Sequence, residues 1–515
     1  MAIRQDCCRP CRRAPVQQPG EGRQTDEGRG VTKEDPPVKG ILQLHLYGGI
    51  HGIAMDSRQV KPGDLFIAVT GAISDGQCFI QDAIENGAAA VVRPPAGAGP
   101  IHNSVPVFEI EDLAEKVGEI ASRFFDEPSQ ALTVIAVTGT NGKTTVTSMI
   151  AEAMSSLGRS CGLIGTLGFG RSIRQLTETG LTTPDPVSLQ RQLAHLYEQE
   201  CQCVALEASS HGLIQGRLNG TRVSASILTN LTQDHLDFHG DMERYRRAKE
   251  LLFELPGIQL RVVNLDDDLG KDLARRYRAE RILSFSLDES AGANIYSRST
   301  SFSTTGMRAE LVTPRGSADF SSVLLGPHNL SNLLATAAVL HWQGYGAEEI
   351  ADALSSLKAV PGRMEVINID EHASAVIDFA HSADALLNAL TTLRQHKPEK
   401  LICVFGCGGD RDRSKRQQMG AVAASLADVI VLTNDNPRSE SPQLIVDEIL
   451  RGILDDMPVE IELDRGKAID RGIEMLAGGG VVLIAGKGHE NYQEVNRERI
   501  HFNDRETVLN YIAAN

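Results

Sequence analysis

Residues 134–145 read Val-Ile-Ala-Val-Thr-Gly-Thr-Asn-Gly-Lys-Thr-Thr, and they carry the most specific signal in the chain. The β-branched run at residues 134–137 is typical of a buried parallel strand, and residues 145–157 have helical spacing. Between them, Gly139 and Gly142 allow a tight turn whose N–H groups can face an anion. A helix that begins behind such a turn directs its N-terminus at the anion. The order of strand, glycine loop and helix therefore predicts a phosphate-binding loop.

The loop also holds the side chains that nucleotide phosphates need. Lys143 can reach the β- and γ-phosphates, and the hydroxyl of Thr144 can bind Mg²⁺. The common phosphate loop has an earlier glycine where this chain has Val137, so the shorter Gly-Thr-Asn-Gly-Lys-Thr-Thr form applies. A plain glycine turn with a surface lysine is the alternative, and the ordered strand, loop and helix disfavour it. The phosphate-binding residues expected here are Gly139, Thr140, Asn141, Gly142, Lys143, Thr144 and Thr145.

Length and composition limit the class of protein. At 515 residues the chain is too long for one ordinary core, and 41% hydrophobic with 23% charged residues is usual for a soluble globular protein. The formal charge of −16 argues against nucleic-acid binding. No apolar stretch approaches the roughly 18 residues of a membrane span. Nine scattered cysteines indicate reduced thiols, so we expect a cytoplasmic, monomeric enzyme.

The first 39 residues differ from the rest in composition. Cys7, Cys8 and Cys11 lie in a segment rich in Arg and Pro. A zinc site needs about four ligands, and no second cysteine pair is close by. We expect residues 1–39 to form a disordered leader; a start codon assigned too far upstream would give the same pattern.

The rest of the chain alternates apolar runs with helical stretches, which predicts an α/β fold with parallel sheets. We expect a small N-terminal α/β domain over residues 40–130, a central P-loop ATPase-like domain over 131–362, and a Rossmann-like α/β domain over 363–515. Alternating Ser- and Thr-rich segments at residues 285–325 predict a β insertion in the central domain. The expected strands are residues 65–69, 88–92, 105–110, 134–137, 203–206, 225–228, 261–264, 376–378, 401–405, 429–432 and 481–484, with a long helix over 328–344.

Polar residues follow two strands of the central domain. A carboxylate such as Glu207, at a strand end near a phosphate loop, is a usual anchor for Mg²⁺, although such a residue alone is more often exposed. Residues 229–240 contain Asp234, His235, Asp237 and His239. Loop capping is an alternative role for the two aspartates, so His235 is the favoured ligand. On sequence pattern alone, Lys249 in the next helix is a surface lysine.

The C-terminal domain places polar loops after its strands, where open parallel sheets bind ligands. Residues 435–438 read Asp-Asn-Pro-Arg, which places the Arg438 guanidinium at a turn and suits it to a carboxylate. Residues 486–490 read Gly-Lys-Gly-His-Glu, where Glu490 can accept from an amine. Ordinary turns are the alternative for these loops and for the glycine-rich residues 406–411.

Together these motifs resemble the Mur ligases over residues 56–506, and among them the ligases that add the third residue of the peptidoglycan peptide. The phosphate loop and residues 207–211, 234–239, 326–329 and 361–363 match the superfamily pattern. Folylpolyglutamate synthases share several of these. The narrower resemblance rests on residues 56–58 and 62–64, which read Asp-Ser-Arg and Pro-Gly-Asp, and on residues 435–438 and 486–490.

The resemblance implies the reaction and its partners. ATP would phosphorylate the γ-carboxylate of D-glutamate in UDP-N-acetylmuramoyl-L-alanyl-D-glutamate. The amine of meso-2,6-diaminopimelate would then attack the acyl phosphate, and ADP and phosphate would leave. Mg²⁺ would offset the crowded phosphate charge, and the N-terminal domain would bind the UDP end.

The resemblance also assigns site residues. Lys249 would be carbamylated, and the metal ligands would be Thr144, Glu207, His235 and the modified Lys249; the catalytic residues would be Lys143, Glu207, His235 and Lys249. Besides the phosphate loop, ATP would contact Asn329, Arg363 and Asp378. The UDP-muramoyl dipeptide would contact Ser57, Thr182, Thr183, Ser209, Gln215 and Arg217. Diaminopimelate would contact Arg411, Asp435, Asn436, Pro437, Arg438, Gly486 and Glu490.

Three alternatives remain open for the function. An L-lysine-adding ligase would lack a partner for a distal carboxylate, and Arg438 and Arg411 favour diaminopimelate. A folylpolyglutamate-type ligase does not account for residues 56–64 and 435–438. A non-catalytic nucleotide-binding regulator has no need of a metal-bridged transfer site. The chain departs from the family at Leu181, Phe379 and Ser382-Ala383, which lie in substrate and nucleotide loops.

Overall fold

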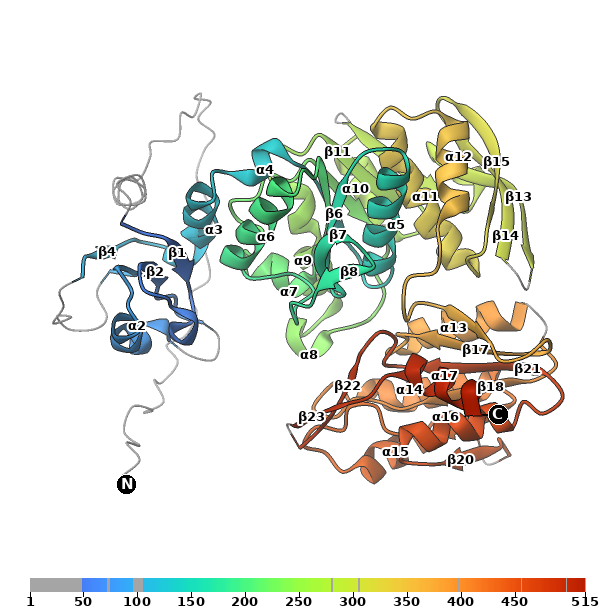
Figure 1. The fold of residues 1–515 in the computed structure, drawn as a ribbon. Helices are drawn as coiled ribbons and strands as arrows, with labels where there is room; N and C mark the ends of the chain where they lie inside the picture. The colour runs from blue at the N-terminus through green and yellow to red at the C-terminus, as the bar shows by residue number, and fades with distance from the viewer. Residues whose placement is uncertain are drawn as a thin grey trace, which may run out of the picture.

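The computed structural model describes residues 49–71, 75–95, 105–278, 281–303, 306–395, 398–454, 456–496 and 498–514. These residues form three α/β units that follow one another from blue through green to red in Figure 1. The expected α/β class with three domains is therefore confirmed. The expected leader at residues 1–39, with its three cysteines, lies outside the described residues.

The N-terminal unit is a small parallel sheet in the order β1-β2-β3-β4. Leu65, Phe66 and Ile67 are fully buried in it. Its elements are β1 (Gly52–Ala54), η1 (Ser57–Gln59), β2 (Asp64–Ile67), η2 (Gly76–Phe79), α2 (Ile80–Glu85), β3 (Ala90–Arg93), β4 (Val107–Glu109) and α3 (Leu113–Phe124).

Backbone groups take part in the contact between the N-terminal unit and the central unit. Arg191 of α6 (Pro186–Glu198) donates from Nη2 to the carbonyl of Ile53 at 2.7 Å. Gly118 of α3 passes so close to Asn219 that a Cβ at Gly118 would lie 1.8 Å from the Asn219 carbonyl oxygen. Because no side chain fits there, α3 lies directly against the loop of the central unit.

The central unit is built on one long mixed sheet. Its strand order is β15-β14-β13-β12-β11-β10-β5-β9-β6-β7-β8, with parallel pairing from β13 through to β6. The parallel strands are β5 (Thr133–Thr138), β6 (Cys161–Gly165), β9 (Cys203–Glu207), β10 (Ala225–Leu228), β11 (Leu260–Asn264), β12 (Ile282–Ser286) and β13 (Ile295–Ser303). The helices are α4 (Pro128–Ala131), α5 (Lys143–Ser156), α6, α7 (Ser210–Ile214), α8 (Leu236–His239), α9 (Met242–Glu254), α10 (Asp268–Arg276), α11 (Pro327–Trp342) and α12 (Ala347–Ser356).

Antiparallel strands extend this sheet at both edges. At one edge β14 (Gly306–Thr313) and β15 (Gly316–Ser322) follow β13, which confirms the predicted β insertion. At the other edge β7 (Gly168–Ser172) and β8 (Gln175–Thr177) form a hairpin that sequence analysis missed. Strands of three to five residues, with two glycines in β7, have little β-propensity, so pairing of β7 with β6 and of β8 with β7 decides their structure.

The C-terminal unit is a second sheet in the order β16-β17-β21-β18-β19-β20, parallel except for β16. Its strands are β16 (Glu365–Asn368), β17 (Ala373–Asp378), β18 (Leu401–Phe405), β19 (Val429–Leu432), β20 (Val459–Ile461) and β21 (Gly480–Ala485), followed by the hairpin of β22 (Tyr492–Val495) and β23 (Glu498–His501). Its helices are α13 (Ala383–Gln395), α14 (Ser414–Leu426), α15 (Pro442–Leu450), α16 (Arg465–Glu474) and α17 (Asp504–Ala514). Across the described residues, no helix has the length and apolarity to cross a membrane.

A buried ion pair should hold α16 and α17 against this second sheet. Arg465 and Asp504 are both fully buried, with Nε and Oδ1 2.7 Å apart. Asp504→Ala would leave the guanidinium buried without its partner, so we expect a loss of about 3–5 kcal/mol in the free energy of unfolding. The measurement is denaturant unfolding followed by a probe in the C-terminal unit.

The control is Glu460→Ala, which removes the partner of the exposed Arg471 on the same unit. We expect it to change stability little, because solvent screens exposed pairs. Equal stability of Asp504→Ala and wild type would contradict the assignment of this pair as a structural support.

Candidate active site

The phosphate loop lies between β5 and α5, as predicted, and its glycines are required by close contacts. A Cβ at Gly139 would lie 1.7 Å from Thr229 Oγ1, and one at Gly142 would lie 2.6 Å from Asn332 Oδ1. Gly142 has a φ of +86°. The helix begins at Lys143, two residues before the predicted start. The Lys143 ammonium donates to the carbonyls of Gly139 and Thr140, each at 2.9 Å, so it lies over the turn where phosphates would bind.

The Glu207 carboxylate is buried at the end of β9 and is held by neutral donors. Oε2 accepts from Thr144 Oγ1 at 3.1 Å and from Thr166 Oγ1 at 3.0 Å, and Oε1 accepts from the Thr166 backbone N–H at 2.8 Å. Among the described residues, Glu207 makes no ion pair. A buried carboxylate without a paired cation, beside a threonine hydroxyl, fits the oxygen ligands that Mg²⁺ prefers. Sequence analysis missed Thr166, because a lone threonine after a strand has no distinctive pattern.

Lys249 is buried, and its reading as a surface lysine is wrong. Tyr245, Ala248, Leu252 and Phe253 are also buried on α9. Their spacing from Lys249 is that of one helix face, so the helical period was the signal that placed Lys249 inside. Its Nζ lies 4.3 Å from the centre of the Tyr245 ring. Burial lowers the pKa of Lys249 well below its usual value, which favours the neutral amine.

Histidines gather beside this helix. The ring of His211 lies 5.1 Å from that of His235 and 5.5 Å from that of His239. His235 Nε2 is 3.5 Å from Asp234 Oδ2, yet burial lowers the pKa of His235 to about 4. The imidazole is therefore neutral at pH 7 and can act as a ligand through a ring nitrogen. In the described part of the chain, no three His, Cys, Asp or Glu side chains form a metal cluster, so any metal here also needs other oxygen donors.

The residues expected to hold the muramoyl dipeptide form a chain of hydrogen bonds beside Glu207. Thr183 Oγ1 donates to the Glu207 carbonyl at 2.8 Å and lies 2.9 Å from Ser209 Oγ. Arg217 donates to the Thr183 carbonyl and to Gln215 Oε1. Thr182 joins the chain because its hydroxyl lies 3.1 Å from Thr166 Oγ1, which can accept from it while donating to Glu207.

Ser57 is not part of that chain of hydrogen bonds. It is buried in η1 of the N-terminal unit, where its carbonyl accepts from Asn86 Nδ2 at 3.0 Å. The structure therefore brings together the five residues expected at the muramoyl dipeptide, and it places Ser57, which is expected at the uridine end, in the N-terminal unit.

The C-terminal unit reaches the phosphate loop through two side chains. Arg363 Nη2 donates to Thr144 Oγ1 at 3.2 Å, and its guanidinium carbon lies 4.3 Å from the centre of the Phe379 ring. Asp384 Oδ2 accepts from Asn141 Nδ2 at 2.9 Å and from Thr232 Oγ1 at 3.1 Å. The two units therefore meet at the phosphate loop, where Figure 1 shows α13 below the central sheet.

Two further residues expected at ATP have internal partners. Asp378 Oδ2 accepts from the Met364 N–H at 2.8 Å. Asn329 is buried and donates from Nδ2 to the Leu325 carbonyl at 2.9 Å. Asn329 has a link to the loop through Asn332, which donates to it and approaches Gly142.

The residues expected at diaminopimelate lie at the ends of β18, β19 and β21. Arg438 Nε is 3.1 Å from Glu494 Oε2, and its Nη1 donates to the Gly409 carbonyl at 2.8 Å. Asn436 Nδ2 donates to Glu490 Oε2 at 2.9 Å. The other expected residues lie beside these. A Cβ at Gly486 would lie 2.8 Å from Asp435 Oδ2, and Gly408 is close to both Arg411 and Arg438. Pro437 directly precedes Arg438 in the chain.

The side chains around this group include residues that sequence analysis left without a role. Glu494 lies on β22 and pairs with Arg438, and Lys487 is fully buried against Glu490. The β22–β23 hairpin was missed because every residue of β22 is half-buried and every residue of β23 is exposed, so neither strand has a buried face.

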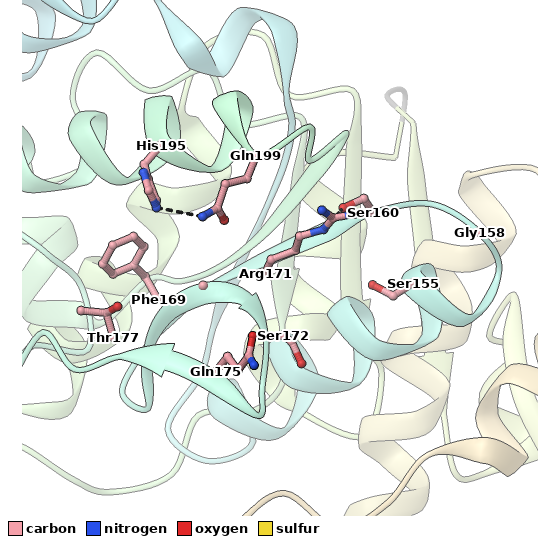
Figure 2. Close-up of a pocket in the computed structure, with 11 residues that line it drawn as sticks. Ser155, Gly158, Ser160, Phe169, Arg171, Ser172, Gln175, Thr177, His195 and Gln199 are labelled. Atoms are coloured by element: carbon pink, nitrogen blue, oxygen red, sulfur yellow. Dashed lines mark hydrogen bonds between the residues drawn. The ribbon is translucent and has the colours of Figure 1, made fainter.

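Two hollows beside the β7–β8 hairpin lie apart from these loops. One of about 480 Å³ is lined by polar residues that include Arg171, Gln175 and His195, and Figure 2 shows Phe169 between the hairpin and α6. The other, of about 400 Å³, shares Phe169 and His195 and includes Leu181. None of the predicted site residues lines either hollow. The candidate site is therefore defined by the polar residues of the loops described above, and neither hollow is part of it.

The Asp378 carboxyl should make stability depend on pH. Burial raises its pKa from 3.8 to about 6, so between these values the folded state binds the proton more tightly than the unfolded state. Its contribution to stability is therefore greatest below pH 4, falls as the pH rises to about 6, and is constant above that.

Asp378→Asn should remove this dependence, so the stability difference between variant and wild type should change by about 2–3 kcal/mol from pH 4 to pH 7. The measurement is unfolding of both proteins across that range. A difference that does not vary with pH would contradict the raised pKa.

Comparison with known proteins identifies the family. The family models that match are the Mur ligase family, catalytic domain over residues 49–125, the Mur ligase middle domain over residues 137–340, and the Mur ligase, glutamate ligase domain over residues 362–488. The UDP-N-acetylmuramoyl-L-alanyl-D-glutamate–2,6-diaminopimelate ligase of Ectopseudomonas mendocina (strain ymp) is 46% identical over 457 residues, which are 88% of this chain and 93% of that protein. The enzyme of the same name from Coxiella burnetii (strain RSA 493 / Nine Mile phase I) is 44% identical over 462 residues, 89% of this chain and 94% of that protein.

A solved structure of an enzyme with that name also has a similar fold. It has a TM-score of 0.65 and 38% sequence identity, covering 90% of this chain and 95% of that chain. Matches to three family models, with these identities over most of the sequence, show that the chain belongs to the Mur ligase family.

Proposed function

We propose that this enzyme adds meso-2,6-diaminopimelate to the γ-carboxylate of D-glutamate in UDP-N-acetylmuramoyl-L-alanyl-D-glutamate, with ATP as the energy source, during peptidoglycan precursor synthesis. The relatives at 46% and 44% identity carry that activity in their names. The observation that carries the proposal is that Arg363 of the C-terminal unit donates to Thr144 beside the buried Glu207. A phosphate loop, an acidic metal anchor and a second unit's cation meet there, as phosphoryl transfer requires.

Phosphoryl transfer would take place at this junction. Lys143 and Arg363 would hold the phosphates of ATP and balance the charge that develops on them. A γ-carboxylate oxygen of D-glutamate would attack the γ-phosphorus, and ADP would leave. The amine of diaminopimelate would then attack the acyl carbon and lose a proton, and phosphate would leave. Asn329 and Asp378 would contact the nucleoside, with Asp378 toward the ribose.

The residues present fit a magnesium site. Thr144, Glu207, His235 and carbamylated Lys249 would hold the ions, and Glu207 supports this because its buried charge has no ion-pair partner among the described residues. When bound, Mg²⁺ would neutralise the crowded phosphate oxygens. Carbamylation changes a buried cation into an anion and so accounts for a lysine at this position.

The remaining groups would select the two other substrates. Ser57 and the N-terminal domain at residues 40–130 would bind the UDP end, and the chain of hydrogen bonds from Thr182 to Arg217 would bind the dipeptide. In the C-terminal domain, Arg438 and Arg411 would bind the distal carboxylate of diaminopimelate, and Glu490 its distal ammonium. We propose that the reaction takes place in the cytoplasm, where ATP is supplied. We also propose that the enzyme acts as a monomer.

Phosphate release tests this function directly. Wild-type enzyme with ATP, Mg²⁺ and UDP-N-acetylmuramoyl-L-alanyl-D-glutamate should release phosphate rapidly with meso-diaminopimelate and slowly with L-lysine. A preference for L-lysine would favour the lysine-adding alternative. Release with a folate and L-glutamate instead would favour the folylpolyglutamate-type alternative.

Arg438 should determine affinity for diaminopimelate. Its Nη2 makes no hydrogen bond among the described residues, which leaves a donor for the distal carboxylate. Removing one partner of such a pair in a closed site costs about 2–5 kcal/mol, so Arg438→Ala should raise the KM for diaminopimelate by at least about 30-fold. The KM for ATP should change little. Arg451→Ala, an exposed arginine of the same unit, is the matched control, and unchanged diaminopimelate kinetics in Arg438→Ala would remove Arg438 from the site.

Lys249 should carry a carbamate. Burial lowers the pKa of Lys249 and so favours the neutral amine, which is the form that reacts with CO₂. Enzyme equilibrated with ¹³C-bicarbonate should therefore give a carbamate carbon signal in ¹³C NMR that Lys249→Ala lacks. Lys249→Ala should also be nearly inactive and partly rescued by acetate or propionate, whose carboxylate can replace the carbamate.

The control is Lys271→Ala, in which a half-exposed lysine of α10 is lost. It should keep both the carbamate signal and the activity. A fully active Lys249→Ala variant, with no carbamate signal in wild type, would show that this lysine has another role.

A further inference from the structure

Lys487 is a fully buried cation beside the proposed amino-acid site, and the reaction described above does not use it. Its Nζ lies 2.8 Å from Glu490 Oε2, 3.1 Å from Asn436 Oδ1 and 3.7 Å from Asp435 Oδ1. It therefore contacts three of the groups expected to hold diaminopimelate, although its own side chain is closed off from solvent.

These contacts join the residues of the pocket into one network. Asn436 accepts from Lys487 at Oδ1 and donates from Nδ2 to Glu490, so its amide orientation depends on both. The same Oδ1 accepts from the Glu494 N–H at 2.9 Å, and Glu494 pairs with Arg438. Through Asn436, Lys487 thus supports both the acidic and the basic side of the pocket.

Lys487 also sets the charge of the acidic side. Asp435 is 7% exposed and the Glu490 side chain 20% exposed, so two poorly solvated carboxylates share one ammonium. Two other buried cations act on these carboxylates, but Arg465 is paired with Asp504 at 2.7 Å, and Arg363 donates to Thr144. With Lys487 present, the acidic side has one uncompensated negative charge next to the Arg438–Glu494 pair. Without the Lys487 ammonium, the carboxylates of Asp435 and Glu490 would both be unpaired and would attract a cation.

We infer that Lys487 is a positioning residue that selects a zwitterionic end group over a purely cationic one; this inference rests on the proposed function. Diaminopimelate offers a distal ammonium together with a carboxylate, and one negative charge beside the remaining Nη2 donor of Arg438 matches that end. L-lysine offers the ammonium alone and would be favoured by a more negative pocket. Lys487 thus excludes L-lysine by limiting the negative charge, while Arg438 attracts the carboxylate.

The test compares Lys487→Met with wild type, using the full chain with ATP, Mg²⁺ and the UDP-muramoyl dipeptide. The KM for meso-diaminopimelate, the inhibition constant of L-lysine against it and the KM for ATP are measured. We expect a higher KM for diaminopimelate and a lower inhibition constant for L-lysine, so that the ratio between them shifts by about tenfold or more. The KM for ATP should stay the same.

Lys467→Met is the matched control, because Lys467 is an exposed lysine of the same unit. Lys487→Gln serves as a second variant, since its amide still donates to Asn436 but carries no charge. It should shift the ratio in the same direction as Lys487→Met.

Three results would overturn the inference. A merely structural lysine would weaken both amino acids equally and leave their ratio unchanged. Failure of both variants to fold would assign Lys487 to stability instead of selection. Failure of the proposed function can be distinguished from failure of this inference, because the wild-type enzyme itself would then release no phosphate with diaminopimelate.

Discussion

A carboxylate buried at the end of β9 is the constraint on which the rest of the candidate site depends. Glu207 is 1% exposed and is stabilised by the hydroxyls of Thr144 and Thr166 and by one backbone N–H. Those donors reach it only if α5 begins at the phosphate loop and β6 ends beside β9. The close approach also requires glycine at position 165, where a Cβ would lie 2.2 Å from Glu207 Oε1. The parallel pairing of β5, β9 and β6 therefore places a negative charge, a phosphate loop and a turn at one edge of the sheet.

The C-terminal unit also contributes side chains to the proposed nucleotide site. Its sheet also ends in polar loops, and the segment after β17 contacts the phosphate loop through Asp384. Arg363 donates to Thr144, and Asp384 accepts from Asn141 and Thr232. Since the C-terminal unit contributes both a cation and an anion to this junction, bound phosphates would change the balance of these contacts. Nucleotide binding and the relative position of the two units are therefore expected to be linked.

Much of this arrangement could be predicted from the sequence, and the exceptions have physical reasons. The phosphate loop was predictable because strand, glycines and helix each have a local pattern, and the strand at residues 203–206 is a continuous apolar run. Lys249 was misread because its residue type was weighed above its helical spacing. Thr166 and Lys487 were missed since their roles depend on neighbours from distant strands, such as β9 for Thr166. The β7–β8 hairpin owes its structure to pairing with β6 and has no strong pattern of its own.

The central claim is that the chain forms an acyl phosphate on the substrate's γ-carboxylate before the amine attacks. Oxygen transfer tests it directly. UDP-N-acetylmuramoyl-L-alanyl-D-glutamate labelled with ¹⁸O in the γ-carboxylate is turned over with ATP and meso-diaminopimelate, and the released phosphate is analysed by mass spectrometry. If the account is right, each phosphate carries one ¹⁸O from the carboxylate. Phosphate without the label, formed together with the amide product, would show that the carboxylate is activated in another way and would contradict the account.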